Sequence, residues 1–350
     1  MSDELLNIQS FRSIDSLPIS ETTPEFLDET RVRAHIARAT ERRRYEGDAD
    51  PRRYLLERRC LVPAGDQLLV TPAGLLCFGY DPQRIFPHAA VNLIHYRGSE
   101  ASSFDVIHIE RAIGGTIFEQ LARLEDYLNK NTHRGMTVRR GFERVDIDEY
   151  PTVVLRELTV NMLAHRDYRD LQSLAHIKLF ADHIEWMNPG GLPEGVTIDQ
   201  LLKVQCSRNP TLFAILYESG LIEGVGQGLD TVVSILEREQ MQPAQFEDIN
   251  HAFFVAQVYG RPWEALYEQD LYAKLSERQR RILGIVRQRG SVSSNDVLET
   301  LNSQGAQVAY RSVARDISDL QQMGLLVTSG RSRSTRYAIP DAPTQLPLPE

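Results

Sequence analysis

Hydrophobic and polar positions along the chain follow two different periods. In "IGGTIFEQLARLEDYLNKNT", the apolar residues Ile117, Leu121, Leu124 and Leu128 fall on one face, which predicts an amphipathic helix. The runs "AAVNLIHYRG", "LAHIKLF", "HIEWMN" and "HAFFVAQVYG" lack this period and predict strands, the middle two joined by a turn at residues 181–182. The mixture predicts an α/β fold.

The first part of the chain combines a helical period with high charge. "DETRVRAHIARATERRRYEG" predicts a charged helix that ends at Gly47. Its arginine run is more typical of a solvated helix face than of a contact with nucleic acid. We therefore expect a helical, solvent-rich segment over residues 1–60.

A further helix, within "VVLRELTVNMLAHRDYRD", carries a polar stripe. Glu157, Asn161 and His165 are four residues apart, so they share one side of the helix. By itself this pattern is typical of a surface helix. The positions that can face the core are Leu155, Leu158, Met162 and Leu163.

Two glycine-rich loops follow this helix and favour a ligand site. The loop "NPGG" begins at Asn188 after a predicted strand, and the loop "GVGQG" begins at Gly224 before a predicted helix. Glycines permit close approach of the backbone, and N–H groups at a helix start can hold phosphate. The second loop is not a Rossmann fingerprint, because no strand immediately precedes it. It is not a P-loop either, because no Gly-Lys-Ser/Thr follows.

Four segments together resemble a bacterial family: "VVLRELTVNMLAHRDY", "IEWMNPGGLPEG", "SRNPTLFAILYESGLIEGVGQGLDTV" and "TPAGLLCFGYDPQRIFP". They look like the ATP-binding regulators described as RecG-like C-terminal or Schlafen-AlbA-associated proteins. The central domain of such proteins is similar to the GHKL ATPase fold of gyrase, MutL and histidine kinases, so the resemblance implies an α+β sandwich. Many relatives begin with an AlbA domain, and "SFRSIDSLPISETTPEF" resembles the junction that follows it. We therefore expect that domain to be absent, and its activity is not carried over.

The resemblance implies a site for ATP and Mg²⁺. Glu157 would orient or activate water as the candidate catalytic residue, and Asn161 would hold the Mg²⁺ bound to the triphosphate, since Mg²⁺ takes oxygen ligands and keeps several waters. Asn188 would lie near the adenine, where the GHKL fold usually has an aspartate. This replacement leaves ATP hydrolysis open. The other implied nucleotide-binding residues are His165, Arg166, Gly190, Gly191, Arg208, Asn209, Gly224, Gly226 and Gly228.

The C-terminal part has the order helix, helix, helix, strand, strand. Ser293 or Ser294 can cap the second helix. The third helix has Val313, Ile317 and Leu320 on one face, and "LLVTS" and "TRYAI" predict two strands around "GRSR". This order predicts a winged helix-turn-helix, and the segment resembles bacterial transcription regulators.

We expect this module to bind double-stranded DNA. Its third helix would enter the major groove, and the wing would contact phosphates or a minor groove. Residues 271–340 hold 11 Lys and Arg against 5 Asp and Glu, which favours DNA over the alternative, a winged helix that contacts proteins. The candidate DNA-binding residues are Tyr310, Arg311, Ser312, Arg315, Arg331, Arg333 and Arg336.

Composition narrows the class of protein. The chain of 350 residues is 42% hydrophobic and 25% charged, which is ordinary for two or three globular domains. Cys60, Cys77 and Cys206 are scattered, so neither a disulfide framework nor a zinc site is predicted. No signal-peptide pattern and no bilayer-length apolar run is present, and we expect a cytoplasmic protein.

These observations predict a helical segment at 1–60, a GHKL-like ATP-binding domain at 61–265, a linker at 266–274, a winged helix-turn-helix DNA-binding domain at 275–340 and a flexible tail at 341–350. The leading hypothesis is a bacterial transcription regulator in which ATP·Mg²⁺ binding modulates DNA binding, and a homodimer would suit paired half-sites. Two alternatives remain. One is a DNA-stimulated ATPase in DNA processing or phage defence, and the other is an interaction module with a vestigial nucleotide pocket.

Overall fold

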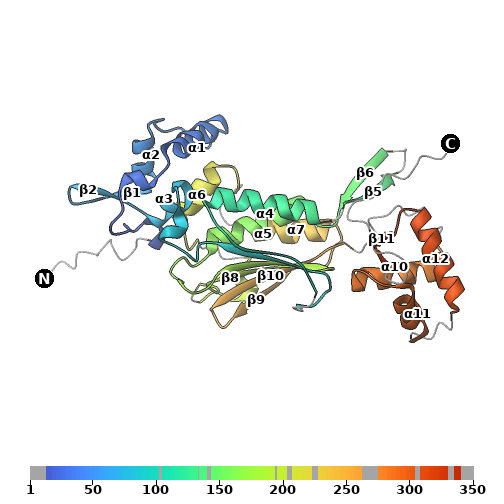
Figure 1. The fold of residues 1–350 in the computed structure, drawn as a ribbon. Helices are drawn as coiled ribbons and strands as arrows, with labels where there is room; N and C mark the ends of the chain where they lie inside the picture. The colour runs from blue at the N-terminus through green and yellow to red at the C-terminus, as the bar shows by residue number, and fades with distance from the viewer. Residues whose placement is uncertain are drawn as a thin grey trace.

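A mixed sheet with helices on one face forms the centre of the molecule (Figure 1). The computed structural model describes residues 13–101, 105–132, 134–139, 143–193, 195–202, 207–222, 228–261, 275–303, 308–329 and 335–339. Within them, six strands pair in the order β4-β3-β7-β8-β10-β9; β3 and β7 are parallel and the other neighbours antiparallel. The predicted α/β class is confirmed in this form. The strands are β3 (Val91–Tyr96), β4 (Val106–Ile113), β7 (Ala175–Leu179), β8 (His183–Pro189), β9 (Gln245–Ile249) and β10 (Phe253–Tyr259).

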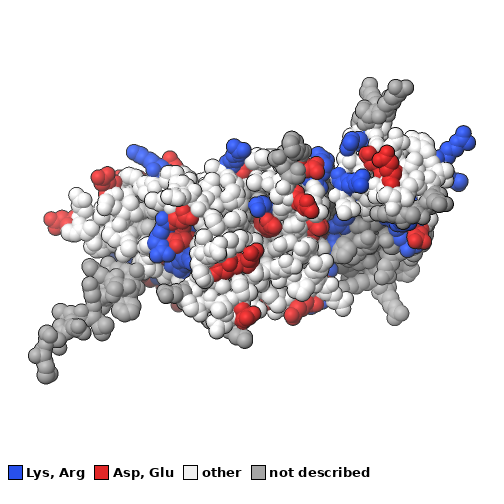
Figure 2. All heavy atoms as spheres, turned by 90° about the horizontal axis from the view of Figure 1, so that it is seen from below, with Lys and Arg blue, Asp and Glu red and all other residues white. Residues whose placement is uncertain are grey.

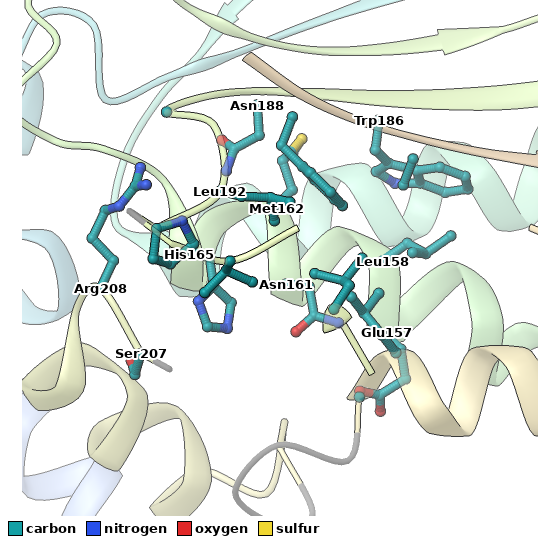
Figure 3. A pocket seen from close by; sticks show the side chains of 18 of the residues that line it. Glu157, Leu158, Asn161, Met162, His165, Trp186, Asn188, Leu192, Ser207 and Arg208 are labelled. Carbon is teal, nitrogen blue, oxygen red and sulfur yellow. The ribbon is translucent and has the colours of Figure 1, made fainter. Parts of the chain in front are cut away.

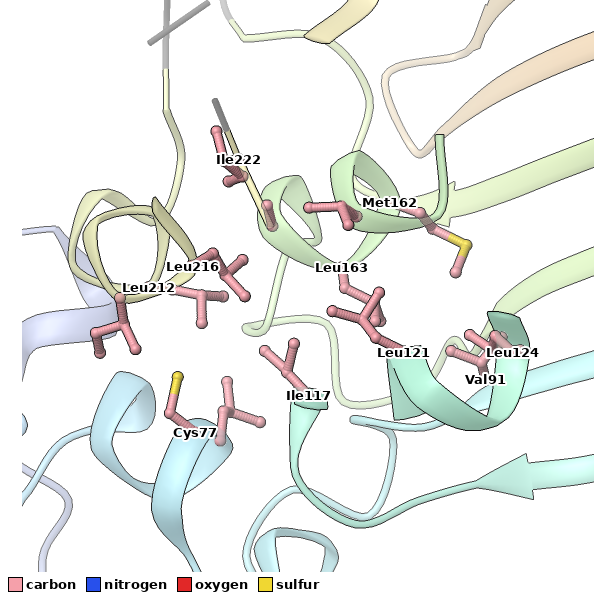
Figure 4. Close-up of a cluster of buried hydrophobic side chains, with 14 of the residues drawn as sticks. Cys77, Val91, Ile117, Leu121, Leu124, Met162, Leu163, Leu212, Leu216 and Ile222 are labelled. Atoms are coloured by element: carbon pink, nitrogen blue, oxygen red, sulfur yellow. The ribbon is translucent and has the colours of Figure 1, made fainter. Parts of the chain in front are cut away.

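Three of the described helices lie along one face of the sheet (Figure 1). They are α4 (Ile117–Asn131), α5 (Thr152–His165) and α7 (Gly228–Arg238). A capping box starts α4, because the Thr116 side chain accepts a hydrogen bond from Glu119 N and the Glu119 carboxylate accepts one from Thr116 N. Trp186 Nε1 donates to Thr159 Oγ1 at 3.1 Å, which fixes α5 to β8. Apolar side chains fill the space between these elements (Figure 4).

The N-terminal elements share this core, since Val32, Ile36 and Tyr54 belong to the same buried cluster as Leu216. The predicted charged helix is present as α1, but it ends at Glu41 rather than at Gly47. The N-terminal elements are η2 (Ile14–Ser16), η3 (Pro24–Phe26), α1 (Glu29–Glu41), α2 (Pro51–Glu57), β1 (Leu61–Ala64), β2 (Gln67–Val70), α3 (Pro72–Phe78) and η4 (Pro82–Arg84). Helix α6 (Pro210–Glu218) packs against α3 and η2, and η5 (Ile198–Gln200) contacts β9.

A buried carboxylate joins the N-terminal helices to α6. Glu218 is 3% exposed and accepts a hydrogen bond from Tyr54 Oη at 2.6 Å. It also pairs with Arg58 and lies 3.3 Å from His35 Nε2. Burial alone would raise the pKa of Glu218, but the hydrogen bonds from His35, Tyr54 and Arg58 outweigh it and lower the pKa. The carboxylate is therefore ionised and fully paired inside the protein.

The C-terminal residues form a second hydrophobic core of their own, which includes Ile282, Val297, Val313 and Leu320. Ser293 is the serine that caps α11, because its Oγ accepts a hydrogen bond from Asp296 N at 3.2 Å. The elements are α10 (Glu277–Arg289), α11 (Ser294–Ser303), α12 (Tyr310–Gln322), β11 (Val327–Ser329) and β12 (Arg336–Ala338), the two strands pairing antiparallel. The expected linker at 266–274 and tail at 341–350 lie outside the described residues.

Several strands were not predicted from the sequence: β1, β2, β4, β9 and the antiparallel hairpin of β5 (Arg134–Arg139) and β6 (Glu143–Asp148). Seen from below, charged side chains are scattered over the uncovered side of the sheet, and Lys and Arg recur at the right-hand, C-terminal end (Figure 2). Throughout the described part of the chain, no helix is both long and apolar enough to cross a bilayer.

Candidate nucleotide-binding site

The polar stripe of α5 lines a cavity rather than the outer surface. Glu157, Asn161 and His165 all border a cavity of about 190 Å³ between α5, β8 and the start of α7 (Figure 3). Glu157 is 6% exposed, and Arg156 Nη2 donates to its carboxylate at 3.0 Å. The spacing of four residues thus directs three polar side chains at one enclosed space.

The buried polar atoms at this cavity that have no hydrogen-bond partner among the described residues include Asn161 Nδ2 from α5 and Asn188 Oδ1 from β8. An unpaired buried amide is unfavourable by roughly 1–3 kcal/mol, so such atoms are groups to which a bound ligand can supply a partner. Both side chains border the cavity in Figure 3. The arrangement can therefore supply hydrogen bonds to a ligand from two opposite elements.

The start of α7 approaches α5 closely. A Cβ on Gly228 would lie 2.8 Å from Asn161 Nδ2 and 3.2 Å from Glu157 Oε2. Glycine at this point thus lets the helix start approach Asn161 and Glu157 without displacing their side chains. Gly224 and Gly226, which precede it in the predicted loop, lie outside the described residues.

The loop after β8 forms another wall. Gly190 has a φ of +93°, and Gly190 and Gly191 both border the cavity. Arg208 Nη2 donates to Gly191 O at 2.7 Å, and Arg208 lies 3.8 Å from the Asp167 carboxylate. Arg208 is thus positioned at the cavity by the glycine loop that the sequence singled out.

His165 is neutral at physiological pH. Burial, with a smaller contribution from the positive charge of Arg208, lowers its pKa to about 4. A neutral imidazole can both donate and accept one hydrogen bond. At this cavity His165 therefore acts as a polar, uncharged group.

Two sequence candidates do not border the cavity. The Arg166 guanidinium is buried and donates to the carbonyls of Ala90 and Ser173, each at 2.8 Å. Asn209 Nδ2 donates to the carbonyls of Ala164 and Arg166. Both side chains hold the turn after α5 through these hydrogen bonds, and neither borders this cavity.

Apolar walls of the cavity were not singled out from the sequence. Met162, Trp186, Leu192 and Phe254 border it from α5, β8, the glycine loop and β10. Their sequence signal was the same as that of core residues, because apolar strand and helix positions do not reveal whether they face protein or a ligand. These walls give the cavity the mixed character usual for small-molecule sites.

The candidate DNA-binding residues occupy different positions on the C-terminal elements. Tyr310, Arg311 and Arg315 are exposed on α12, with Ser312 half-buried beside them. Arg336 lies on β12, where its Nη1 donates to the Ser291 carbonyl at 2.9 Å. Arg331 and Arg333 lie outside the described residues.

One family model matches part of the chain. Residues 173–256 match the family described as "Putative ATP-dependent DNA helicase recG C-terminal". This segment runs from just before β7 into β10 and includes Asn188 and the glycine loop, while α5 precedes it. The match supports an ATPase-like domain here and, with it, nucleotide binding.

A solved structure shows a similar fold. The chain resembles the DIP2311 protein from Corynebacterium diphtheriae with a TM-score of 0.58 and 19% identity, covering 94% of this chain and 64% of that one. The chain thus spans less than two thirds of that protein's length, and at this identity the likeness shows the fold alone. No curated protein matches the chain.

Proposed function

We propose that this protein is a transcription regulator that binds ATP with Mg²⁺ at the cavity and double-stranded DNA through its C-terminal module. The observation that carries the nucleotide part is that Asn161 Nδ2 and Asn188 Oδ1 are buried without a hydrogen-bond partner among the described residues, at a cavity that α5 lines together with the ATPase-like region. A nucleotide could satisfy both, because a phosphate oxygen can accept a hydrogen bond from Asn161 Nδ2 and the exocyclic amine of a base can donate one to Asn188 Oδ1.

The residues present fit a purine nucleotide. Met162, Leu192 and Phe254 offer apolar surfaces for a base, and Asn188 Oδ1 can accept a hydrogen bond from an exocyclic amine. Asn161 would hold Mg²⁺ through its amide oxygen, and the ion would neutralise phosphate charge. The N–H groups at the start of α7, near Gly228, suit an anion.

Glu157 is the residue that would accept a proton from water, since its carboxylate borders the cavity beside Asn161. Measuring whether the bound ATP is hydrolysed would distinguish a transcription regulator from an ATPase. DNA-stimulated steady-state hydrolysis would favour the alternative of an ATPase in DNA processing or phage defence. A cavity that binds no nucleotide would favour a vestigial pocket.

For the C-terminal elements we infer a winged helix-turn-helix with α12 as its recognition helix. The supporting observations are the separate core, the order of helices and strands, and the exposed Arg311 and Arg315. Recognition helices of this type enter the major groove. A homodimer in the cytoplasm would present two such helices to paired half-sites.

The decisive experiment is a thermal unfolding titration with ATP·Mg²⁺. Ligand that binds only the folded state adds RT ln(1 + [L]/Kd), about 2.7 kcal/mol at 100 times Kd. We expect Asn161→Ala to lose the Mg²⁺-dependent part of this gain and Glu157→Gln to keep binding while losing any hydrolysis. Asn131→Ala, an exposed asparagine at the end of α4, is the matched control. A wild-type melting temperature that does not respond to millimolar ATP·Mg²⁺ would refute nucleotide binding.

A further inference from the structure

One arginine holds together the far ends of the two helices that line the cavity. Arg261, just after β10, donates from Nε to the Asp148 carbonyl at 3.1 Å and from its backbone N to the Glu149 carbonyl at 2.9 Å. These residues lead directly into α5. Arg261 Nη1 also donates to the carbonyl of Glu239, the residue after α7, at 3.2 Å. The junction around Arg261 is thus a shared anchor for both helices.

The cavity lies at the opposite ends of the same two helices. Asn161 and His165 border it from the C-terminal half of α5, and Gly228 borders it from the first residue of α7. Rigid helices can carry a displacement at the cavity to the ends that Arg261 holds. α5 and α7 also pack against each other.

The C-terminal module contacts this junction through Arg287 of α10. Arg287 Nη2 donates to the Arg261 carbonyl at 3.3 Å and lies 3.5 Å from Glu149 Oε1. The two side chains of the ion pair are 20% and 6% exposed. A buried pair of this kind fixes geometry more than it adds stability. Gly290, at the end of α10, gives a second contact, because a Cβ there would collide with the Arg97 side chain after β3.

We propose that Arg287 and Arg261 are positioning residues that couple the cavity to the C-terminal module. A ligand that shifts α5 against α7 changes the junction, and Arg287 passes that change to α10. The reverse also holds, because coupling between two binding sites is reciprocal. This inference deepens the proposed function and rests on it for its ligands, ATP·Mg²⁺ and DNA.

The test compares full-length wild type with Arg287→Ala, Arg287→Lys and Arg289→Ala. Arg289 is the matched control, since it is an exposed arginine two residues along the same helix. The dissociation constant for a duplex is measured with and without ATP·Mg²⁺. Typical coupling changes affinity about 5- to 150-fold. We expect ATP·Mg²⁺ to change the dissociation constant for the duplex by such a factor in wild type and in Arg289→Ala. In Arg287→Ala we expect the change to be no more than about twofold. We expect Arg287→Lys to restore part of it, because the charge remains but the planar donor group is lost.

Each ligand's own affinity separates this inference from the proposed function. If wild type binds no ATP·Mg²⁺ or no DNA, the corresponding part of the proposed function fails. If it binds both without coupling, or if Arg287→Ala stays coupled, the positioning role is overturned. A ligand-free measurement tests the junction itself. We expect the two hydrophobic cores to unfold in one transition in wild type and Arg289→Ala, and in two transitions in Arg287→Ala. Identical unfolding of all three proteins would overturn the junction.

Discussion

Gly228 lies so close to Asn161 that a Cβ at position 228 would stand 2.8 Å from Asn161 Nδ2 and 3.1 Å from its Oδ1. The side chain that we assign to Mg²⁺ and the helix start that we assign to phosphate are therefore in direct steric contact. This relationship joins α5 and α7 at the cavity, and a side chain at position 228 would displace the Asn161 amide.

We predict that Gly228→Ala lowers the affinity for ATP·Mg²⁺ by about tenfold, because Asn161 must move to admit the methyl group; this corresponds to about 1.4 kcal/mol. Isothermal titration calorimetry measures it. Gly284→Ala in α10 is the control, since nothing lies within 4 Å of a Cβ there. That substitution should leave nucleotide affinity unchanged and raise stability by up to about 1 kcal/mol, as alanine is the better helix former. Equal nucleotide affinity in both variants would contradict the assignment.

His165 makes stability depend on pH in a defined window. Burial lowers its pKa to about 4, whereas an exposed histidine titrates near 6.5. As pH falls, the unfolded chain therefore binds the proton before the folded protein does. The free energy of unfolding is unaffected by this group above pH 6.5 and decreases as pH falls from 6.5 toward 4. The loss is at most about 3 kcal/mol. Urea unfolding of wild type and His165→Gln at several pH values measures it. A slope between pH 6.5 and 4 that His165→Gln leaves unchanged would rule the effect out.

The sequence predicted the elements whose patterns are local. The four-residue spacing of Glu157, Asn161 and His165 placed all three at one cavity, and the strands before and after residues 181–182 pair as expected. It did not show that Arg166 and Asn209 lie away from this cavity, because a polar side chain beside a motif helix can serve either a ligand or nearby backbone carbonyls. Only the fold shows that the carbonyls of Ala90 and Ser173 meet Arg166.

Strands that alternate charged and apolar residues were harder to predict. β4 reads "VIHIERAI", and its polar residues are explained only by helix α4 beneath it, where Glu110 pairs with Arg123 and His108 stacks on Tyr127 at 5.0 Å. Such pairs join residues of two different elements, so neither the hydrophobic period of one segment nor its composition predicts them. The same limit hid the role of Arg261, whose partners lie at the ends of three different elements.

The buried cluster around Glu218 should be essential for the N-terminal packing. Glu218→Ala leaves Arg58 without its buried partner, and removing one member of such a pair destabilises by about 3–5 kcal/mol. Tyr54→Phe removes one hydrogen bond to the carboxylate, an effect of about 1.5–3 kcal/mol. Glu237→Ala, an exposed glutamate on α7, should stay within about 0.5 kcal/mol of wild type. Chemical denaturation compares the three. Similar values for Glu218→Ala and Glu237→Ala would show that the cluster is not structural.

Measurements of DNA binding can distinguish residues that recognise the base sequence from residues that contribute only positive charge. Arg311 and Arg315 are exposed one turn apart on α12, so both can face base edges. Replacing either with alanine should weaken binding to a matched site by about 1–3 kcal/mol and relax preference at one position. Titrations on matched and scrambled duplexes measure this. Arg38→Ala, an exposed arginine on α1, controls for the loss of one positive charge and should change neither duplex.

The arginines of the proposed wing, Arg331, Arg333 and Arg336, should affect DNA binding differently from those on α12. Loss of Arg331 or Arg333 should weaken all duplexes similarly and flatten the log–log salt dependence by about one unit, the effect of one phosphate contact. Arg336 already donates to the Ser291 carbonyl. Arg336→Ala should therefore change the salt slope less than the other two variants and lower the melting temperature instead. Binding titrations at several salt concentrations, with a melting curve for each variant, decide between these roles.

If the full-length protein binds neither duplex at low salt, with or without ATP·Mg²⁺, the module contacts proteins. If the wing variants alter sequence preference and those on α12 do not, the proposed docking is inverted.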